Sequence, residues 1–445
     1  MPETRTHHRV AQLVACMVAM AAIANLQYSW TLFTTPLTKS LGAKLSDVQW
    51  AFSLFIICQT WLVPVEGWFI DRFGARVVVA LGGILVGLGW IGCGFAQSLG
   101  GLYFWSAIGG VGAGAVYGAA IGTALKWFPD RRGLAAGLAA GAYGFGTALT
   151  VIPIQLMIDS RGYEYAFIFW GVVQGLMVLG AAQLLRKPPA GWHPPGRGFT
   201  FARESAVAKA QVSYTPWEML KTSTFWTLYV MMALVAFGGM MIVAQIKPIA
   251  SQYGLDKGVL WFGASALSLA LILDRVVNGF TRPFWGWVSD YIGRYMAMAI
   301  TFSLEAAAIV LLLQFVHQPV AFVVLSGFVF FAWGNIYSLF PAAIADVFGS
   351  EYATTNYGLQ YTAKGTAAIF AAGGAAWLAE QTGSWTSVFW IAVLCDVAAA
   401  GLAFFWLRPL VARLTKERRE VPSGAAALEM VGGSLAVTSG RPPES

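Results

Sequence analysis

The chain has 445 residues, of which 58% are hydrophobic and only 11% charged, and its mean hydropathy is +0.64. Globular proteins carry about 25% charged residues, so a soluble fold of this chain would bury a core too large for its surface. The formal net charge of +7 raises nucleic acid as a partner, but the distribution of the basic residues explains that charge without one. These values predict a polytopic protein of the lipid bilayer that binds no nucleic acid.

Long uncharged runs recur along the chain, each close to the roughly 20 residues that a helix needs to cross a bilayer. The spans are expected at about 10–33, 47–70, 77–97, 101–125, 134–158, 165–185, 223–247, 259–288, 296–316, 319–344, 356–380 and 385–407. They predict an all-α protein with an N-terminal six-helix bundle (1–185), a cytoplasmic linker (186–222) and a C-terminal six-helix bundle (223–408). The tail (409–445) is charged and then rich in Gly, Ala, Ser and Pro, which is typical of disorder.

The N-terminus and the cysteines exclude further classes of protein. Residues 1–24 resemble a signal peptide, but the apolar segment continues to Phe33, which is too long for a signal core. All four cysteines fall in apolar runs, and the four histidines make no ligand pattern. We therefore expect neither a disulfide framework nor a metal site, and no cofactor.

Two polar motifs, at the ends of the second and eighth expected spans, repeat each other. The motifs are Gly67-x-x-x-Asp71-Arg72-x-Gly74-x-Arg76 and Gly286-x-x-x-Asp290-x-x-Gly293-Arg294. Pro64 and Pro283 each stand three residues before the first glycine of their motif, about half the chain apart. A direct repeat of six spans is typical of membrane proteins whose halves are related by an axis normal to the membrane.

The basic residues predict the orientation of the chain. With the N-terminus inside, the cytoplasmic segments hold 20 of the 28 Lys and Arg residues, and the outer loops and span ends hold five. Three more lie within spans, namely Arg275, Arg282 and Lys364. Because cytoplasmic segments are enriched in Lys and Arg, we expect both termini on the cytoplasmic side of the cell (inner) membrane.

Glycines recur at every fourth position in two neighbouring spans. They are Gly110, Gly114, Gly118 and Gly122 in the fourth span, and Gly133, Gly137 and Gly141 at the start of the fifth. Small residues at this spacing let helix backbones approach closely, so tight packing is the first interpretation. The alternative is a glycine face that lines a substrate path or serves as a moving joint.

Two cations lie deep within the C-terminal spans. Arg282 and Lys364 each lie eight residues from the cytoplasmic end of their span, about 12 Å into the membrane. A cation at that depth persists only with a partner, a cavity or an anion. One interpretation is that Glu305 and Asp396, the other buried acids, neutralise them as fixed pairs, and the other is that an anionic substrate binds between them.

Asp274 and Arg275 lie about two turns farther out on the eighth span, and five aromatic residues accompany the cations. Asp274 and Arg275 are adjacent, so they point apart on a helix, and we interpret them as a structural or gating pair, with a second anion contact as the alternative. The aromatic residues are Tyr28, Tyr117, Trp333, Tyr337 and Tyr361. Aromatic residues in spans usually pack or lie at interfaces, but these lie away from the span ends, where hydroxyl and indole groups can donate to a carboxylate.

The duplicated motif resembles the signature of the major facilitator superfamily. Within that superfamily the chain is similar to the oxalate/formate antiporter family, through stretches that reach from the first span to the eleventh. They are Gln27–Leu32, Lys126–Leu134, Arg282–Gly286, Trp333–Pro341, Asn356-Tyr-Gly and Ala363-Lys364. The resemblance implies the twelve-helix major facilitator fold and a carrier that is not an enzyme. It also implies that Arg282 and Lys364 bind a dicarboxylate, with Tyr28, Tyr117, Trp333, Tyr337 and Tyr361 lining the site.

Three departures from the family bear on the substrate. Tyr361 stands where the oxalate transporter has Trp, and Asp274-Arg275 replaces an uncharged pair. Related proton-coupled monocarboxylate carriers have Asp where this chain has Asn278, and an amide cannot carry a proton. The leading function is therefore a secondary active exchange of small carboxylates, oxalate for formate, by alternating access. The alternative is a proton-coupled monocarboxylate symporter with Asp274 as the proton carrier.

Other function classes lack a sequence feature of their own. A receptor needs a folded output domain, and the tail after Arg408 is too short for one. No nucleotide-binding motif and no catalytic constellation occurs. We expect a carrier that works as a monomer. Charged residues at the cytoplasmic ends of spans two and eight are expected to pair across the two halves and hold the outward-open state. These residues are Asp71, Arg72, Arg76, Asp290 and Arg294.

Overall fold

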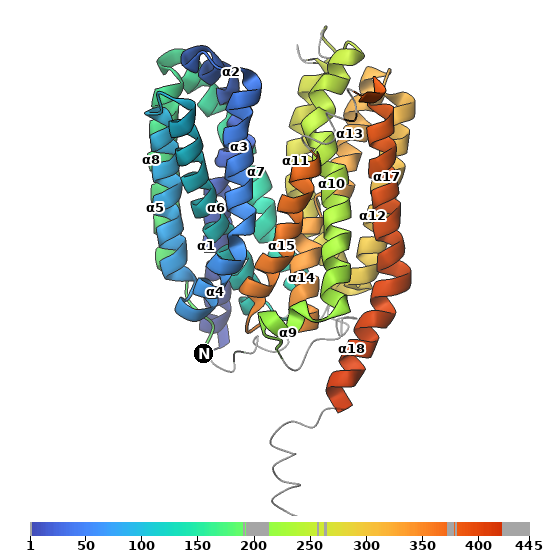
Figure 1. Ribbon diagram of the computed structural model, residues 1–445. Coiled ribbons are helices and arrows are strands. Elements are labelled where there is room, and N and C mark those ends of the chain that lie inside the picture. The colour runs from blue at the N-terminus through green and yellow to red at the C-terminus, as the bar shows by residue number, and fades with distance from the viewer. Residues whose placement is uncertain are drawn as a thin grey trace, which may run out of the picture.

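The computed structural model describes residues 2–189, 192, 213–255, 258–261, 265–371, 378 and 381–420. Its helices run side by side in two groups (Figure 1). The first group contains α1 (Pro2–Tyr28), α2 (Trp30–Leu41), α3 (Leu45–Trp61), α4 (Val63–Phe73), α5 (Ala75–Gly94), α6 (Leu99–Trp127), α7 (Arg132–Arg161) and α8 (Tyr163–Leu184).

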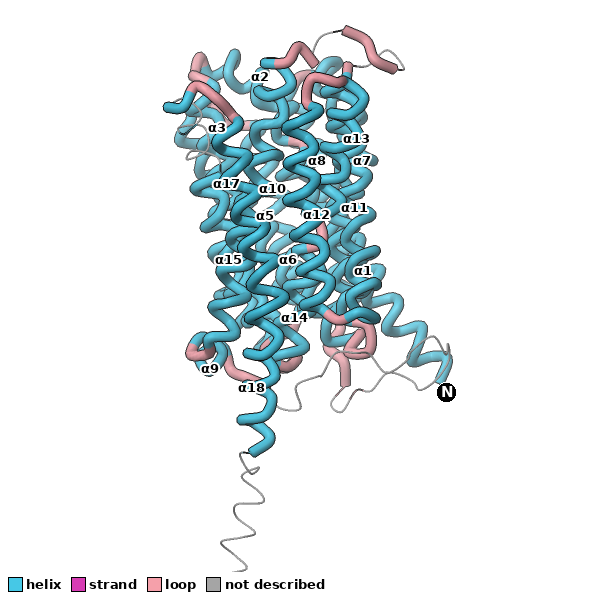
Figure 2. The backbone as a smooth tube through the Cα atoms, turned by 90° about the vertical axis from the view of Figure 1, so that its right-hand side faces the viewer, coloured by secondary structure: helices cyan, strands magenta, loops and turns pink. Residues whose placement is uncertain are grey.

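The second group follows the short helix α9 (Pro216–Leu220). It contains α10 (Ser223–Gln252), α11 (Ala266–Ile292), α12 (Arg294–Phe315), α13 (Pro319–Trp333), α14 (Ile336–Phe348), α15 (Ala353–Ile369), α17 (Thr386–Gly401), the π-helix η2 (Leu402–Leu407) and α18 (Arg408–Glu420). The N-terminal end of α1, α9 and α18 all lie at the same end of the molecule in both views (Figures 1 and 2).

Helix also occurs where the sequence suggested linker and tail. Within the expected linker, Thr215 begins α9 with a capping box, in which Thr215 and Glu218 each accept a hydrogen bond from the other's backbone N–H. Within the expected tail, α18 continues the last span as far as Glu420. The rest of the tail (421–445) and residues 193–212 of the linker lie outside the described residues.

The membrane-spanning segments agree with the twelve expected ones. Within the described residues, eight helical segments are long and apolar enough to cross a membrane, and two bent pairs raise that number to ten. The other two expected spans coincide with α11, which carries four charged side chains, and with α15, which is described over only 17 residues. The predicted fold class, an all-α polytopic membrane protein, is confirmed.

Three of the expected spans are each built from two helices. The first breaks at Ser29 between α1 and α2, the second at Leu62 between α3 and α4, and the tenth at Gly334 and Asn335 between α13 and α14. Pro64, which has no N–H to donate, lies in the first turn of α4. Tyr28 is the last residue of α1 and Trp333 is the last residue of α13, so two of the expected binding residues lie directly at breaks.

The internal repeat extends to the backbone. Gly74 follows α4 with φ 91° and ψ 158°, and Gly293, its counterpart in the second motif, follows α11 with φ 92° and ψ 151°. Side chains other than glycine rarely adopt this conformation. The second glycine of each motif therefore makes the same sharp connection between consecutive spans.

The two groups approach each other closely between α7 and α11, where glycine faces glycine. A Cβ atom added at Gly133 would lie 2.3 Å from the backbone oxygen of Gly286, and one added at Gly286 would lie 2.2 Å from that of Gly133. At Gly137 a Cβ atom would lie 2.4 Å from the backbone oxygen of Arg282. The glycine stripe of the fifth span is therefore a packing face, and it lies where the two groups meet.

A matching approach joins α4 and α6 to α15. A Cβ atom at Gly67 would lie 2.8 Å from the Cα atom of Thr355, and one at Gly122 would lie 2.1 Å from the hydroxyl oxygen of Thr354. Of the remaining glycines in the stripe of the fourth span, Gly110 and Gly114 pack against the backbone of α3, and Gly118 faces the side chain of Val63 on α4. Tight packing accounts for both glycine stripes.

We expect Gly286→Ala to destabilise the protein, because its methyl group would overlap the main chain of α7. Overpacking of this kind costs about 1–3 kcal/mol. Gly180→Ala in α8 is the matched control, since a Cβ atom there has nothing within 4 Å. Thermal unfolding of the purified protein in detergent should show a lower midpoint for Gly286→Ala and an unchanged midpoint for Gly180→Ala. Equal midpoints would contradict the close approach.

Candidate functional site

Arg282 lies in the interior of the protein, on the face of α11 that meets the first group. Its side chain is 1% exposed. Nη1 donates to the backbone oxygen of Ala140 on α7 at 2.8 Å, and Nη2 and Nε donate to Oδ1 of Asn278 at 3.1 and 3.3 Å. Nη2 also reaches the hydroxyl of Tyr28 at 3.4 Å. Every one of these acceptors is neutral, so the guanidinium is oriented without its charge being cancelled.

Lys364, on α15, is a second buried cation and shares an aromatic neighbour with Arg282. It is 2% exposed, and Nζ donates to the hydroxyl of Tyr361 at 2.9 Å. The ring of Tyr337 lies 4.6 Å from Cζ of Arg282 and 5.5 Å from Nζ of Lys364. None of the ion pairs found among the described residues involves either cation. The two positive charges thus flank one ring face with no protein anion bound to them.

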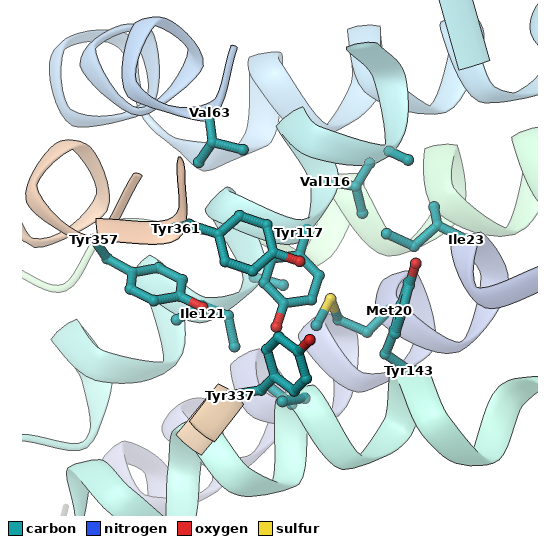
Figure 3. Close-up of a cluster of buried hydrophobic side chains, with 14 of the residues drawn as sticks. Met20, Ile23, Val63, Val116, Tyr117, Ile121, Tyr143, Tyr337, Tyr357 and Tyr361 are labelled. Atoms are coloured by element: carbon teal, nitrogen blue, oxygen red, sulfur yellow. The ribbon is translucent and has the colours of Figure 1, made fainter. Parts of the chain in front are cut away.

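A cluster of tyrosines lies beside the two cations, and Figure 3 shows its members Tyr117, Tyr143, Tyr337, Tyr357 and Tyr361. Tyr117 of α6 stacks on Tyr361 of α15, with centroids 4.8 Å apart and planes inclined by 12°. Tyr357 lies 5.6 Å from Tyr361, and the hydroxyls of Tyr117 and Tyr357 have no hydrogen-bond partner among the described residues. Because the rings come from both groups of helices, the cluster spans the plane where the groups meet.

Trp333 lies at the edge of this cluster. Its ring packs edge-on against Tyr337, with centroids 5.6 Å apart, and covers Gly239 of α10, where a Cβ atom would lie 2.1 Å from the indole. Its indole nitrogen has no partner within the described part of the chain. Trp333 is therefore linked to the cations through Tyr337.

Two tyrosines of the cluster were absent from the expected set. Tyr143, on α7, donates to Gln27 at 2.7 Å, accepts from Gln59 at 3.0 Å, and packs edge-on against Tyr28. Tyr357 lies one helical turn before Tyr361. Its spacing from Lys364, at i−7, places it on the same side of α15 and could have indicated it. Tyr143 lies inside the glycine stripe of α7, which the sequence presents as packing.

The two buried acids do not neutralise the cations. Glu305 on α12 and Asp396 on α17 are both 0% exposed, and none of their carboxylate oxygens has a hydrogen-bond partner in the described structure. Asp396 lies against α10, where a Cβ atom at Gly238 would be 3.1 Å from its Oδ1. The hypothesis of fixed pairs with Arg282 and Lys364 is therefore not supported by the contacts.

Asp274 and Arg275 point in different directions, as adjacent residues on a helix must. Asp274 is 3% exposed, and its carboxylate oxygens have no hydrogen-bond partner among the described residues. Arg275 is half-buried, with Cζ 4.7 Å from the ring centroid of Tyr28 on α1. The two side chains are not within ion-pair distance of each other, whereas Arg275 reaches across to the first group.

A network of ion pairs closes the end of the protein where the N-terminus lies. Arg132, at the start of α7, pairs with Asp346 of α14 at 2.8 Å, and Asp346 pairs with Arg294 of α12, also at 2.8 Å. Arg294 in turn pairs with Asp290 at 2.6 Å. Asp290 accepts hydrogen bonds from the backbone N–H groups of Gly133 and Leu134, at 3.1 and 3.0 Å. The first turn of α7 is thereby held by three helices of the other group.

This network contains only part of the expected gating set. Asp290 and Arg294 belong to it, but the pair that crosses between the groups is Arg132–Asp346, which the sequence did not single out. Arg72 stacks on Trp68 of its own helix, and Arg76 donates to Gln183 within the first group. The side chain of Asp71 lies outside the described residues.

The fold and this arrangement of charges define a polytopic membrane carrier built from two groups of helices. The model of the Major Facilitator Superfamily matches residues 15–279 and 266–439. The chain therefore belongs to the Major Facilitator Superfamily, and it is a transporter and not an enzyme.

Comparisons with individual proteins agree. The chain is 36% identical over 394 residues to the oxalate:formate antiporter of Oxalobacter formigenes, covering 88% of this chain and 90% of that one. It is 26% identical to monocarboxylate transporter 12-B of Danio rerio, covering 88% and 85%. Among solved structures, the proton:xylose symporter XylE has the same fold, with a TM-score of 0.68 at 12% identity, covering 91% of this chain and 96% of that one.

We expect Asp346→Asn to open the end of the protein that carries the ion-pair network. Removing one partner of a buried pair leaves an uncompensated charge, at a cost of about 3–5 kcal/mol. A reporter cysteine at Ile121, in a background without other cysteines, should react with a bulky thiol reagent several-fold faster from that side.

Asp130→Asn is the matched control for this prediction, because Asp130 pairs with Arg9 inside the first group, at 3.2 Å. It removes the same charge from the same end of the protein without touching a contact between the groups. Equal labelling rates in the two variants would contradict a closing role for Arg132–Asp346.

Proposed function

We propose that this protein is a secondary active transporter of small carboxylates that exchanges oxalate for formate by alternating access. The observation that carries the proposal is the pair of buried cations, Arg282 and Lys364, which flank the ring of Tyr337 and form no ion pair among the described residues. The relative from Oxalobacter formigenes, named an oxalate:formate antiporter, supports it over nearly the whole chain.

The geometry suits a small planar dianion. Arg282 presents a planar fork that would bind a carboxylate through two parallel hydrogen bonds once its long 3.4 Å bond to the hydroxyl of Tyr28 is given up. Lys364 presents a compact charge for the other carboxylate. The tyrosine rings bound the space from both groups of helices. The unpartnered hydroxyls of Tyr117 and Tyr357 are donors for the outer oxygens, and Trp333 holds Tyr337 in place.

The conformational cycle follows from where the groups touch. The network around Asp346 holds one end together, so we infer that the substrate enters from the other end. Rocking of one six-helix bundle against the other would break Arg132–Asp346 and release α7 from Asp290. We infer that the closed end is cytoplasmic, with both termini inside the inner membrane, and that one chain, holding a complete site, works as a monomer.

Proton-coupled monocarboxylate symport is the alternative function, and the similarity to the monocarboxylate transporter from Danio rerio is the observation in its favour. Asn278 argues against it, because its amide oxygen already accepts two hydrogen bonds from Arg282 and carries no titratable proton. Asp274 would have to carry the proton instead, one helical turn farther along α11.

We expect Arg282→Lys to impair exchange strongly although it keeps the charge, because an ammonium cannot replace the fork and loses the bond to Ala140. Loss of a bidentate contact of this kind costs about 1.5–3 kcal/mol, or roughly ten- to a hundredfold in kcat/KM. Exchange of labelled oxalate in proteoliposomes measures it, and Arg72→Lys on the surface of α4 serves as the control.

Lys364→Gln is expected to reduce oxalate transport more than formate transport, because a monoanion needs only the Arg282 end of the site. Counterflow with each labelled anion compares the two. Equal losses for both substrates would count against a site with two cationic ends.

We also expect the exchange to move charge. Oxalate is a dianion and formate a monoanion at neutral pH, so one-for-one exchange carries one net negative charge inward, worth about 2.3 kcal/mol per 100 mV. In formate-loaded proteoliposomes, an inside-positive potential set by potassium and valinomycin should speed oxalate entry, and an inside-negative one should slow it. A rate that follows a pH gradient and ignores voltage would favour proton symport.

A further inference from the structure

We propose that Arg275 and Tyr28 form an outer anion subsite, which takes up a small carboxylate from the open side before it reaches Arg282. The inference rests on the proposed function and adds a second cationic contact to the substrate's route.

The geometry places one tyrosine between two guanidinium groups. Arg275 lies seven residues before Arg282 on α11, about 10 Å along the helix and away from the closed network. Cζ of Arg275 lies 4.7 Å from the ring centroid of Tyr28, and Nη2 of Arg282 lies 3.4 Å from the hydroxyl of the same residue. Tyr28 thus separates an outer cation from an inner one.

Exposure changes across this tyrosine. Arg275 and Tyr28 are both half-buried, whereas Arg282 is 1% and Lys364 2% exposed. No ion pair of Arg275 occurs among the described residues, and the neighbouring Asp274 lies buried on another face of α11. A half-buried guanidinium with no carboxylate bound among the described residues attracts anions through its charge.

The position of Tyr28 at the end of α1 would allow its ring to move out from between Arg275 and Arg282. Tyr28 is the last residue of α1, and Ser29 alone separates it from the start of α2. A movement of α2 relative to α1 would therefore shift the ring that lies between Arg275 and Arg282. An anion held at Arg275 could then pass to Arg282 without leaving contact with a positive charge.

A purely structural role for Arg275 makes a different prediction. If Arg275 served only to hold α1 and α11 together through its contact with the ring of Tyr28, its loss would change the KM equally at the two faces of the membrane. An outer subsite affects only the encounter from the open, extracellular side. The sidedness of the KM therefore separates the two roles.

The test measures the KM for oxalate at the outer and the inner face of oriented proteoliposomes. We expect Arg275→Gln to raise the outer KM roughly tenfold and to leave the inner KM within about twofold, which also reports that the variant is folded. Arg275→Lys should stay within about threefold at both faces, since it keeps the charge. Lys39→Gln, which removes an exposed cation on α2, is the matched control and should change neither value.

The unmodified protein gives a second readout that needs no variant. Salt screens a half-exposed cation more than a buried one, so raising the ionic strength should increase the outer KM more than the inner KM. An outer KM that Arg275→Gln leaves unchanged, or that rises equally at both faces, overturns the subsite. If the unmodified protein exchanges no carboxylate at all, it is the proposed function that fails.

Discussion

Two positive charges with no counter-ion among the described residues are the constraint on which this structure depends. A cation in the middle of a bilayer is costly, by about 2.5–3.5 kcal/mol on insertion scales and more in simulations. The protein lowers this cost with neutral acceptors and ring faces, namely the carbonyl of Ala140, the amide of Asn278 and the ring of Tyr337. It does not lower it with Glu305 or Asp396, which are buried elsewhere in the second group. The positive charge that remains uncompensated at Arg282 and Lys364 can attract an anion.

Helix α11 connects the two cations to the end of the protein that the ion-pair network closes. α11 carries Arg282 at the site, Gly286 at the close approach to α7, and Asp290 in the ion-pair network. Arg282 and Asp290 both bind the main chain of α7, at Ala140 and at the first turn of the helix. A substrate that binds Arg282, as we propose, would therefore act on the same pair of helices that the ion-pair network holds together.

The level at which a residue lies along its helix was predictable from the sequence. The direction in which its side chain points around the helix was predictable only in part. The distance of Arg282 and Lys364 from their span ends placed them at one level, and the structure gives them a common neighbour in Tyr337. The pair Arg132–Asp346 was not predicted, because many charges lie near that end of the helices and spacing does not tell which ones face each other. Tyr143 was missed because a residue among glycines looks like packing until the neighbouring helix is known.

The joint between α7 and α11 is made by main-chain atoms, since Gly133 and Gly286 each lie against the other's carbonyl oxygen. Arg282 stands one helical turn from Gly286, and its side chain points into the tyrosine cluster instead. The side chain that we propose to bind the substrate and the main-chain atoms that join the two groups thus belong to the same turns of α11. A side chain at the site can therefore be exchanged without altering this contact, whereas any side chain added at Gly133 or Gly286 would force α7 and α11 apart.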